Sequence, residues 1–369
     1  MKTTTSVHHA VLPASSAPGV RPAARRPAAV SGPANDLRGR PLRDLRISVT
    51  DRCNFRCTYC MPREVFGSDY VFMPHADMLT FEEITLVAQV AVGMGVRKLR
   101  LTGGEPLLRR DLETLVGMLA ALRTPEGEPV DITLTTNGTL LEKKAAALKA
   151  AGLQRVTVSL DALDDALFAR MSDSKVSVAT VLRGIEAAEQ AGLAPLKVNM
   201  VVRKGVNDAQ ILPMVERFRH TGHILRFIEF MDVGSTNGWD LREVMTGDEI
   251  LARIGERYPL EPAQAGYRGE VAARWRYTDG GGEIGLITSV SRPFCGDCTR
   301  ARLSPEGQLF LCLFANRGHD LRALVRSGAS EADITARIAA IWSGRDDHYS
   351  EIRGRQTVGH KIEMSYIGG

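Results

Sequence analysis

The sequence has little of what would assign it to several large classes of protein. Six cysteines in 369 residues are too few for a disulfide scaffold. No apolar run approaches the roughly 20 residues that a membrane-spanning helix needs. The net charge is only +4, and an excess of arginine in the first 43 residues accounts for much of it, so no nucleic-acid surface follows from the total. We therefore expect a soluble protein that has neither a membrane nor a nucleic acid as its partner.

Acidic residues and apolar periodicity are also nearly absent from residues 1–40, which are rich in Ala, Pro, Ser and Arg. Such a segment buries too little apolar surface to offset the entropy lost on ordering it, so we predict a disordered extension. An organellar transit peptide would have a similar composition. We favour a flexible bacterial extension and place the protein in the cytoplasm, where cysteines stay reduced.

From residue 44 onward, short β-rich runs alternate with amphipathic stretches about every 40 residues. This alternation predicts parallel strands joined by right-handed crossovers. Six such units are fewer than the eight that close a barrel, so we predict an α/β fold over residues 41–230, a partial open (βα)6 TIM-like barrel. The predicted strands cover residues 44–50, 97–101, 130–136, 155–160, 196–202 and 224–230. The predicted helices cover residues 81–93, 110–123, 140–151, 177–191 and 208–220.

The repeat is lost after residue 230, where we predict a smaller C-terminal domain over residues 231–345 and a tail over 346–369. A hairpin is expected at 271–290 and a helix near 330–342. The run from Gly280 to Gly285 matches the dinucleotide-binding pattern GxGxxG, but it leads into a strand-like segment instead of a helix. We therefore interpret it as a hairpin turn.

Three cysteines, Cys53, Cys57 and Cys60, lie on one short loop after the first predicted strand. Three thiolates can hold three irons of a 4Fe–4S cluster, which normally needs four, so one iron stays open to a small molecule. Two other interpretations remain open for this loop. One is a zinc site completed by a histidine, with His75 the nearest, and the other is a redox dithiol that leaves one cysteine over.

The remaining cysteines form a second triplet, Cys295, Cys298 and Cys312. A zinc site completed by His319 and a second three-cysteine 4Fe–4S cluster both fit this spacing. Arg300 and Arg302 lie between these cysteines and would share one face of an extended strand. Two guanidinium groups beside an open iron suit a polyanionic, nitrogen-containing ligand such as a nucleoside triphosphate.

The first triplet, with the aromatic Tyr59 between its last two cysteines, resembles that of the radical S-adenosylmethionine (SAM) superfamily. Further motifs are similar to those of the GTP 3′,8-cyclase family, and the match runs from about Leu42 to the C-terminus. These motifs are residues 100–106 (RLTGGEP), 135–138 (TTNG), 226–229 (RFIE) with Met231, the Arg-Ala-Arg at 300–302 and the terminal 365–369 (SYIGG). Each motif alone is weak, but their order and spacing together are specific.

The resemblance implies two 4Fe–4S clusters and SAM as cofactors, with GTP as the substrate. Cys53, Cys57 and Cys60 would hold the SAM cluster, and Cys295, Cys298 and Cys312 an auxiliary cluster whose open iron binds guanine. The contacts with SAM would come from Tyr59, Gly104, Ser159 and Met231. The contacts with GTP would come from Arg46, Arg100, Thr135, Lys197, Arg300, Ala301 and Arg302. Four residues would act in catalysis: Arg300, Arg302, Gly368 and Gly369. The two glycines have no side chains, so the terminus that they form can enter a crowded site.

The implied reaction converts GTP to (8S)-3′,8-cyclo-7,8-dihydroguanosine 5′-triphosphate, the first step of molybdenum cofactor biosynthesis. Reductive cleavage of SAM would give a deoxyadenosyl radical that removes hydrogen from C3′ of the ribose, and that carbon would attack C8 of guanine. The family also implies a homodimer and transfer of the product to cyclic pyranopterin monophosphate synthase, but the sequence does not identify the electron donor. Two alternatives remain: a peptide-modifying radical SAM enzyme with an auxiliary cluster, and a non-catalytic zinc or iron–sulfur protein.

Overall fold

The computed structural model of the protein describes residues 34–267, 269–354 and 360–369. Strands lie at the six predicted places, each within two residues of the expected bounds, and each runs parallel to the next. They are β1 (Asp44–Ser48), β2 (Lys98–Thr102), β3 (Asp131–Thr136), β4 (Arg155–Ser159), β5 (Lys197–Val202) and β6 (Ile224–Glu229). All five residues of β2 are buried, as expected for a central strand covered on both faces.

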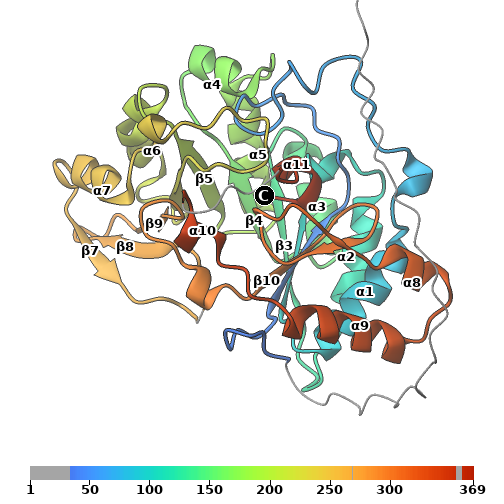
Figure 1. The fold of residues 1–369 in the computed structure, drawn as a ribbon. Coiled ribbons are helices and arrows are strands. Elements are labelled where there is room, and N and C mark those ends of the chain that lie inside the picture. The colour runs from blue at the N-terminus through green and yellow to red at the C-terminus, as the bar shows by residue number, and fades with distance from the viewer. Residues whose placement is uncertain (1–33, 268, 355–359) are drawn as a thin grey trace, which may run out of the picture.

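Helices surround these strands, and the five predicted ones are present (Figure 1). They are α1 (Phe81–Gly93), α2 (Leu112–Ala120), α3 (Leu141–Ala150), α5 (Val178–Gln190) and α6 (Ile211–Phe218). The first begins with a capping box, in which the Thr80 side chain accepts from the backbone N–H of Glu83 and the Glu83 side chain accepts from that of Thr80. A further helix, α4 (Asp165–Ser172), was not predicted.

The C-terminal part of the chain extends this sheet at both edges instead of forming a sheet of its own. The strand β9 pairs in parallel with β6, and β10 pairs in parallel with β1. The predicted hairpin is confirmed as β8 and β9, with the glycine run from Gly280 to Gly282 in its turn. The strands are β7 (Leu260–Ala263), β8 (Ala273–Tyr277), β9 (Glu283–Ile287), β10 (Arg300–Leu303), β11 (Gln308–Phe310) and β12 (His319–Asp320). The helices are α7 (Gly247–Gly255), α8 (Arg322–Arg326), α9 (Glu331–Ser343), α10 (Tyr349–Ile352) and α11 (Met364–Ile367).

The described strands form one twelve-stranded sheet in the order β12-β11-β10-β1-β2-β3-β4-β5-β6-β9-β8-β7. The eight strands from β10 to β9 are all parallel, two more than the sequence predicts, and antiparallel strands extend each end. Within the described part of the chain, no pairing joins the two ends of the sheet. The predicted partial open barrel is therefore confirmed, with two additional parallel strands at its edges.

The boundary of the folded part differs from the sequence-based prediction. Residues 1–33 of the predicted extension lie outside the described residues, but residues 34–40 belong to the folded protein. Asp36 and Arg40 are buried, with 6% and 1% of their surface exposed. Disorder was wrongly expected here because the acid that pairs with Arg40 is a single residue, Asp36, in an otherwise basic segment.

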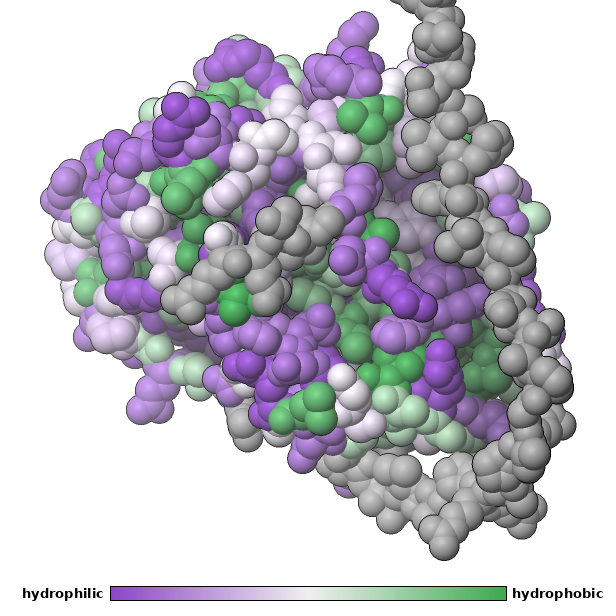
Figure 2. Space-filling view, in the orientation of Figure 1, coloured by the Kyte–Doolittle hydropathy of each residue, from purple (hydrophilic) through white to green (hydrophobic). Residues whose placement is uncertain are grey.

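None of the helices in the described residues is long and apolar enough to cross a membrane. Figure 2 shows hydrophilic residues over much of one face, with hydrophobic residues set back between them. The apolar side chains of the strands and of the inner helix faces form one continuous core.

Candidate active site

A cavity of about 290 Å³ lies inside the barrel and contacts both cysteine triplets. The first triplet follows the carboxyl end of β1, whereas Cys298 precedes β10 and so lies near the amino ends of the same parallel strands. Cys312 follows β11, which runs antiparallel to β10, and this returns it to the same end. A five-residue strand is about 17 Å long, which sets the scale of the separation between the triplets. A substrate bound between the triplets would have one group of cysteines on each side of it.

The loop after β1 presents Cys53, Cys57 and Cys60 to the cavity in partly buried positions. Two backbone N–H groups of this loop donate to carbonyl groups in the last turn of α4. Phe55 packs edge-on against Phe168 of the same helix, with ring centroids 5.8 Å apart. Burial raises the pKa of Cys53 to about 11 and that of Cys57 well above its usual value. These thiols therefore need a cationic metal group beside them to become thiolates.

The double glycine after β2 is required by packing between two loops. A Cβ added at Gly103 or Gly104 would lie 2.5 Å from a backbone oxygen of Thr50 or Arg52, respectively. The N–H of Gly104 donates to that Thr50 oxygen at 2.9 Å, and Gly103 has a φ of +147°. Both glycines also line the cavity. The packing of the two loops therefore requires glycine at both positions, whether or not a ligand also contacts Gly104.

Buried acids and their hydrogen bonds fix the residues around the first triplet. The Tyr59 hydroxyl donates to Asp161 Oδ2 at 2.6 Å, and burial raises the pKa of Asp161 to about 6. Glu105 accepts from the Thr136 hydroxyl and from the backbone N–H of Asn137, both at 2.7 Å. Burial raises the pKa of Glu105 to about 7. Because its hydroxyl is already engaged, Tyr59 offers a ligand mainly its ring and backbone.

A row of arginines crosses the middle of the cavity wall. The strand register places Arg46 of β1 opposite Arg302 of β10 on one side and Arg100 of β2 on the other. Burial and then the charges of Arg302, Arg300 and Arg100 lower the pKa of Arg46 well below its usual value. Like charges directly opposite one another destabilise a sheet. An anion bound along this row would relieve that cost.

None of the four arginines Arg46, Arg100, Arg300 and Arg302 forms an ion pair with a carboxylate of the described residues. Each has a buried side-chain nitrogen without a hydrogen-bond partner in the structure. Buried guanidinium nitrogens without partners are costly unless a ligand supplies acceptors. The row is therefore suited to several phosphate oxygens at once.

Further cavity residues come from the next strands. Burial and then the charges of Arg226 and other cations lower the pKa of Lys197 to about 7. Thr135 accepts a hydrogen bond from Arg100 Nη1 at 3.0 Å. Ser159 and Met231 also line the cavity. The structure thus brings these sequence-predicted residues to one cavity.

The second triplet lies beside two of the predicted arginines. Arg300 and Arg302 both line the cavity, as their alternate positions on one strand predict. Arg300 Nη2 lies 3.6 Å from Cys298 Sγ. Burial alone would lower the pKa of Arg300, but the negative charge of the Cys298 thiolate leaves that pKa raised. Burial raises the pKa of Cys298, but Arg300 and Arg345 outweigh it and bring that pKa to about 6. Ala301, which lies between Arg300 and Arg302, is buried in the core and does not line the cavity.

The two histidines that could complete a zinc site lie outside the cavity lining. His75 is exposed, His319 lies in β12, and neither of these histidines lines the cavity. Among the described His, Cys, Asp and Glu side chains, no group of three is arranged to hold a single metal ion. The described residues of the cavity lining therefore supply no histidine that would complete a zinc site at either triplet.

The chain ends inside the barrel, close to the cavity (Figure 1). Gly368 is buried with a φ of +76°, and a Cβ there would lie 2.1 Å from Thr102 Cγ2 of β2. Gly369 lines the cavity, but Gly368 does not and packs behind it. Lys361 Nζ donates to Asp232 Oδ2 at 2.6 Å, and this bond holds the tail in place just before it reaches the cavity.

Sequence reasoning missed a group of buried charges behind the second triplet. Asp36, Arg40 and Arg345 form ion pairs there, and both arginines donate to backbone carbonyl groups of the cysteines. The residues come from opposite ends of the chain and belong to no recognisable motif. The only available signal was a lone acid, Asp36, in an arginine-rich segment.

Comparison with known proteins shows which families this chain is similar to. The family model of the Radical SAM superfamily matches residues 47–218, and that of Molybdenum Cofactor Synthesis C matches residues 223–351. A GTP 3′,8-cyclase of Acidothermus cellulolyticus is 53% identical over 91% of this chain and 99% of its own length. One of Staphylococcus aureus is 50% identical over 90% of this chain and 98% of its own length. Streptococcus suis SuiB bound to S-adenosylmethionine has the same fold, with a TM-score of 0.56, 15% identity, and coverage of 86% of this chain and 69% of that chain.

Proposed function

This chain belongs to the GTP 3′,8-cyclase family of radical SAM enzymes, and we propose that its cavity converts GTP to (8S)-3′,8-cyclo-7,8-dihydroguanosine 5′-triphosphate. This is the first step of molybdenum cofactor biosynthesis. The observation that carries the proposal is one cavity that contacts both cysteine triplets and has a row of arginines across its wall. A radical formed near one triplet would then meet a substrate held toward the other.

We assign Cys53, Cys57 and Cys60 to the 4Fe–4S cluster that binds SAM. When bound, this cluster and SAM together supply an electron and the radical that removes hydrogen from the substrate. The chain's own contribution is to hold that site in place: the double glycine joins its loop to β2, and α4 supports it from the other side. We propose that Ser159 and Met231, which line the same cavity, contact SAM.

We assign the triphosphate of GTP to the row formed by Arg46, Arg100 and Arg302, together with Lys197. Each hydrogen bond from a guanidinium to a phosphate is worth about 1.5–3 kcal/mol. The unpartnered arginine nitrogens support this assignment, because they would gain acceptors. Holding the ribose and base in a fixed relation to each other promotes the cyclisation by proximity.

We further propose that Cys295, Cys298 and Cys312 hold a second 4Fe–4S cluster, beside which Arg300 binds the base. In this arrangement Gly369 closes the cavity over the substrate and excludes water. The raised pKa of Cys312, about 12, results first from burial, which is the environment of a thiol that needs a metal to ionise.

The test is an anaerobic turnover assay on reconstituted protein with SAM and dithionite, with GTP, with ATP or without nucleotide. We expect 5′-deoxyadenosine to form in a GTP-dependent burst with loss of GTP and appearance of the cyclised product, measured by chromatography and mass spectrometry. Deoxyadenosine formed equally with every nucleotide would point to another radical SAM activity, such as peptide modification. Protein that contains zinc in place of iron and forms no deoxyadenosine would refute the proposal that this chain is a radical SAM enzyme.

The partners follow from the same proposal. We propose a homodimer, a cytoplasmic location and transfer of the product to a cyclic pyranopterin monophosphate synthase. The free state of all six cysteines supports a reducing compartment. The homodimer rests on the family resemblance, and sedimentation of the reconstituted protein tests it.

A further inference from the structure

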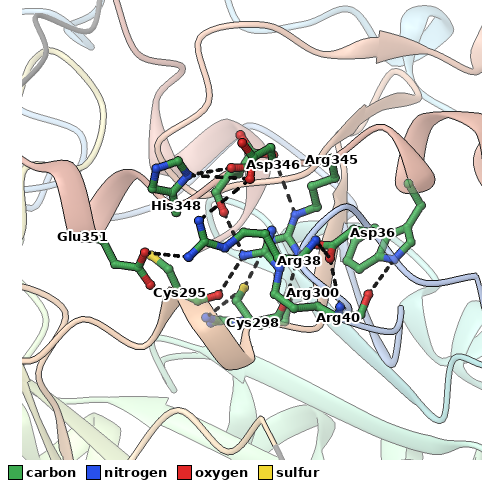
Figure 3. Close-up of polar contacts among 12 residues, drawn as sticks. Asp36, Arg38, Arg40, Cys295, Cys298, Arg300, Arg345, Asp346, His348 and Glu351 are labelled. Carbon is green, nitrogen blue, oxygen red and sulfur yellow. Dashed lines mark hydrogen bonds and ion pairs between the residues drawn. The ribbon is translucent and has the colours of Figure 1, made fainter.

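Three charged side chains, Asp36, Arg40 and Arg345, are buried beside Cys295 and Cys298 of the second triplet (Figure 3), and none of the three lines the cavity. Asp36 Oδ2 accepts from Arg40 Nε at 2.6 Å and from Arg345 Nη1 at 3.1 Å. Asp36 Oδ1 accepts from the backbone N–H groups of Arg38 and Arg40. None of the three side chains exposes more than 1% of its surface. Burying charges is costly unless each is paired and its remaining polar atoms are hydrogen-bonded.

The two arginines reach the cysteines from this group. Arg40 Nη1 donates to the Cys295 carbonyl at 2.7 Å, and Arg345 Nη1 donates to the Cys298 carbonyl at 2.8 Å. Arg345 Nη2 also lies 3.4 Å from Cys298 Sγ, within hydrogen-bond distance of a sulfur acceptor. The fixed fork of one guanidinium thus bonds a carboxylate, a carbonyl and a thiol.

The end of α9 locks this arrangement. The Arg345 guanidinium lies over the Trp342 ring, 4.6 Å from its centroid. The Trp342 indole N–H donates to the Arg40 carbonyl at 3.0 Å, and Trp342 is fully buried. Because each arginine is held at several points, neither can turn away from the cysteines without breaking buried contacts.

Two arginines approach the Cys298 sulfur, and they differ in their surroundings. Arg300 lines the cavity, where a substrate would contact it. Arg345 does not line the cavity, and its buried guanidinium contacts Asp36, the Trp342 ring and, at 3.7 Å, the partly exposed Asp347. The hydrogen bond from Arg345 would therefore stay in place whether or not substrate is bound.

We propose that Arg345, held by Asp36 and Arg40, is a positioning residue that fixes Cys298 and raises the reduction potential of the iron–sulfur cluster on the second triplet. This inference rests on the proposed function, which places a cluster there. The two carboxylates Asp36 and Asp347 balance the two guanidinium groups, so Arg345 acts on the sulfur through its hydrogen bond to Cys298 Sγ. Reduction adds negative charge to a cluster, and both positive charge and hydrogen bonds to its sulfurs favour the reduced state.

The experiment uses the full chain with Cys53, Cys57 and Cys60 each replaced by alanine, so that only the second triplet can bind a cluster. Arg345→Gln, Arg345→Lys and the control Arg326→Gln are made in this background. Arg326 is a partly exposed arginine that pairs with Glu83 at 2.7 Å and lies outside the cavity. The midpoint potential is measured by redox titration, with the reduced cluster followed by electron paramagnetic resonance.

We expect Arg345→Gln to lower the ratio of reduced to oxidised cluster about tenfold at a fixed potential, which is about 59 mV for one electron. Arg345→Lys keeps the charge but not the fork, so a smaller shift in the same direction is expected. The control should match the parent. If Arg345→Gln fails to fold, the lysine variant still decides, and an unshifted potential in it overturns the inference. A parent that binds no iron–sulfur cluster overturns the proposed function instead.

Discussion

The Gly-Gly terminus offers a sharp test of how closely the tail packs against the site. At Gly368 the backbone has a φ of +76° and a ψ of 113°, a conformation that a side chain rarely adopts. A Cβ there would lie 2.1 Å from Thr102 Cγ2, whereas ordinary contacts begin at 3.4 Å. The variant Gly368→Ala must therefore move the terminus or β2 by at least about 1.3 Å, the difference between these distances. Since β2 is buried along its whole length, the terminus should move.

The displaced terminus should impair catalysis far more than stability. The backbone strain amounts to about 1–3 kcal/mol, and the last residues can relieve it by leaving their place. We therefore expect the melting temperature to fall by less than about 2 °C. A misplacement of about 1 Å near the reacting atoms can cost on the order of 10²-fold in rate. The assay is the yield of cyclised product per 5′-deoxyadenosine, which should fall by that order while SAM is still cleaved.

Two further variants separate the clash from the strain. Thr102→Ser removes the Cγ2 atom, after which the nearest Thr102 atoms lie 3.3 Å from the added Cβ, so the double variant should recover part of the product yield. Gly328→Ala is the matched control, because Gly328 has a φ of +73° with nothing within 4 Å, and it should retain full yield. A normal product yield in Gly368→Ala would refute the role of the terminus.

Three other changes test separate parts of the molecule. Cys312→Ser should leave SAM cleavage possible but uncouple it from GTP, and unchanged cyclisation measured by mass spectrometry would remove the second triplet from the mechanism. The pKa of Lys197 is lowered to about 7, so protein without GTP loses this charge as the pH rises, and the affinity for GTP measured by calorimetry should fall between about pH 6.5 and 8.5. Lys197→Met should flatten that dependence, and an equal slope in both proteins would contradict the assignment. Asp36→Ala should lower the free energy of unfolding by about 3–5 kcal/mol, because Arg40 and Arg345 would stay buried without their carboxylate, and an unchanged denaturation midpoint would show that these pairs contribute little.

Local pattern was sufficient for the six strands and for the loops that follow them. Each strand and its helix are contiguous in sequence, so their periodicity and capping residues identify them directly. The missed helix α4 had such a signal, because Asp164 caps it and Leu167, Phe168 and Met171 form its buried face. That error was one of interpretation, since the information was present in the sequence.

The edges of the sheet could not be predicted in this way. The strands β9 and β10 join their neighbours in parallel without a preceding strand–helix repeat, so only the folded chain shows where they pair. The pairing of β10 with β1 also sets Arg302 beside Arg46, although these residues lie far apart in sequence. The buried group behind the second triplet has the same origin, because Asp36 and Arg345 meet only after both ends of the chain are in place.

The row of arginines shows why such long-range pairing carries the function. Alternate positions on β1 and β10 could have held apolar residues, as Leu45 and Leu303 do on the opposite face. Instead the register sets Arg302, Arg46 and Arg100 side by side, and burial together with the repulsion between these charges lowers the pKa of Arg46. A fold selected for stability alone would avoid this arrangement. An anion that bridges the row would offset this cost, as the proposed function expects of a polyanionic substrate.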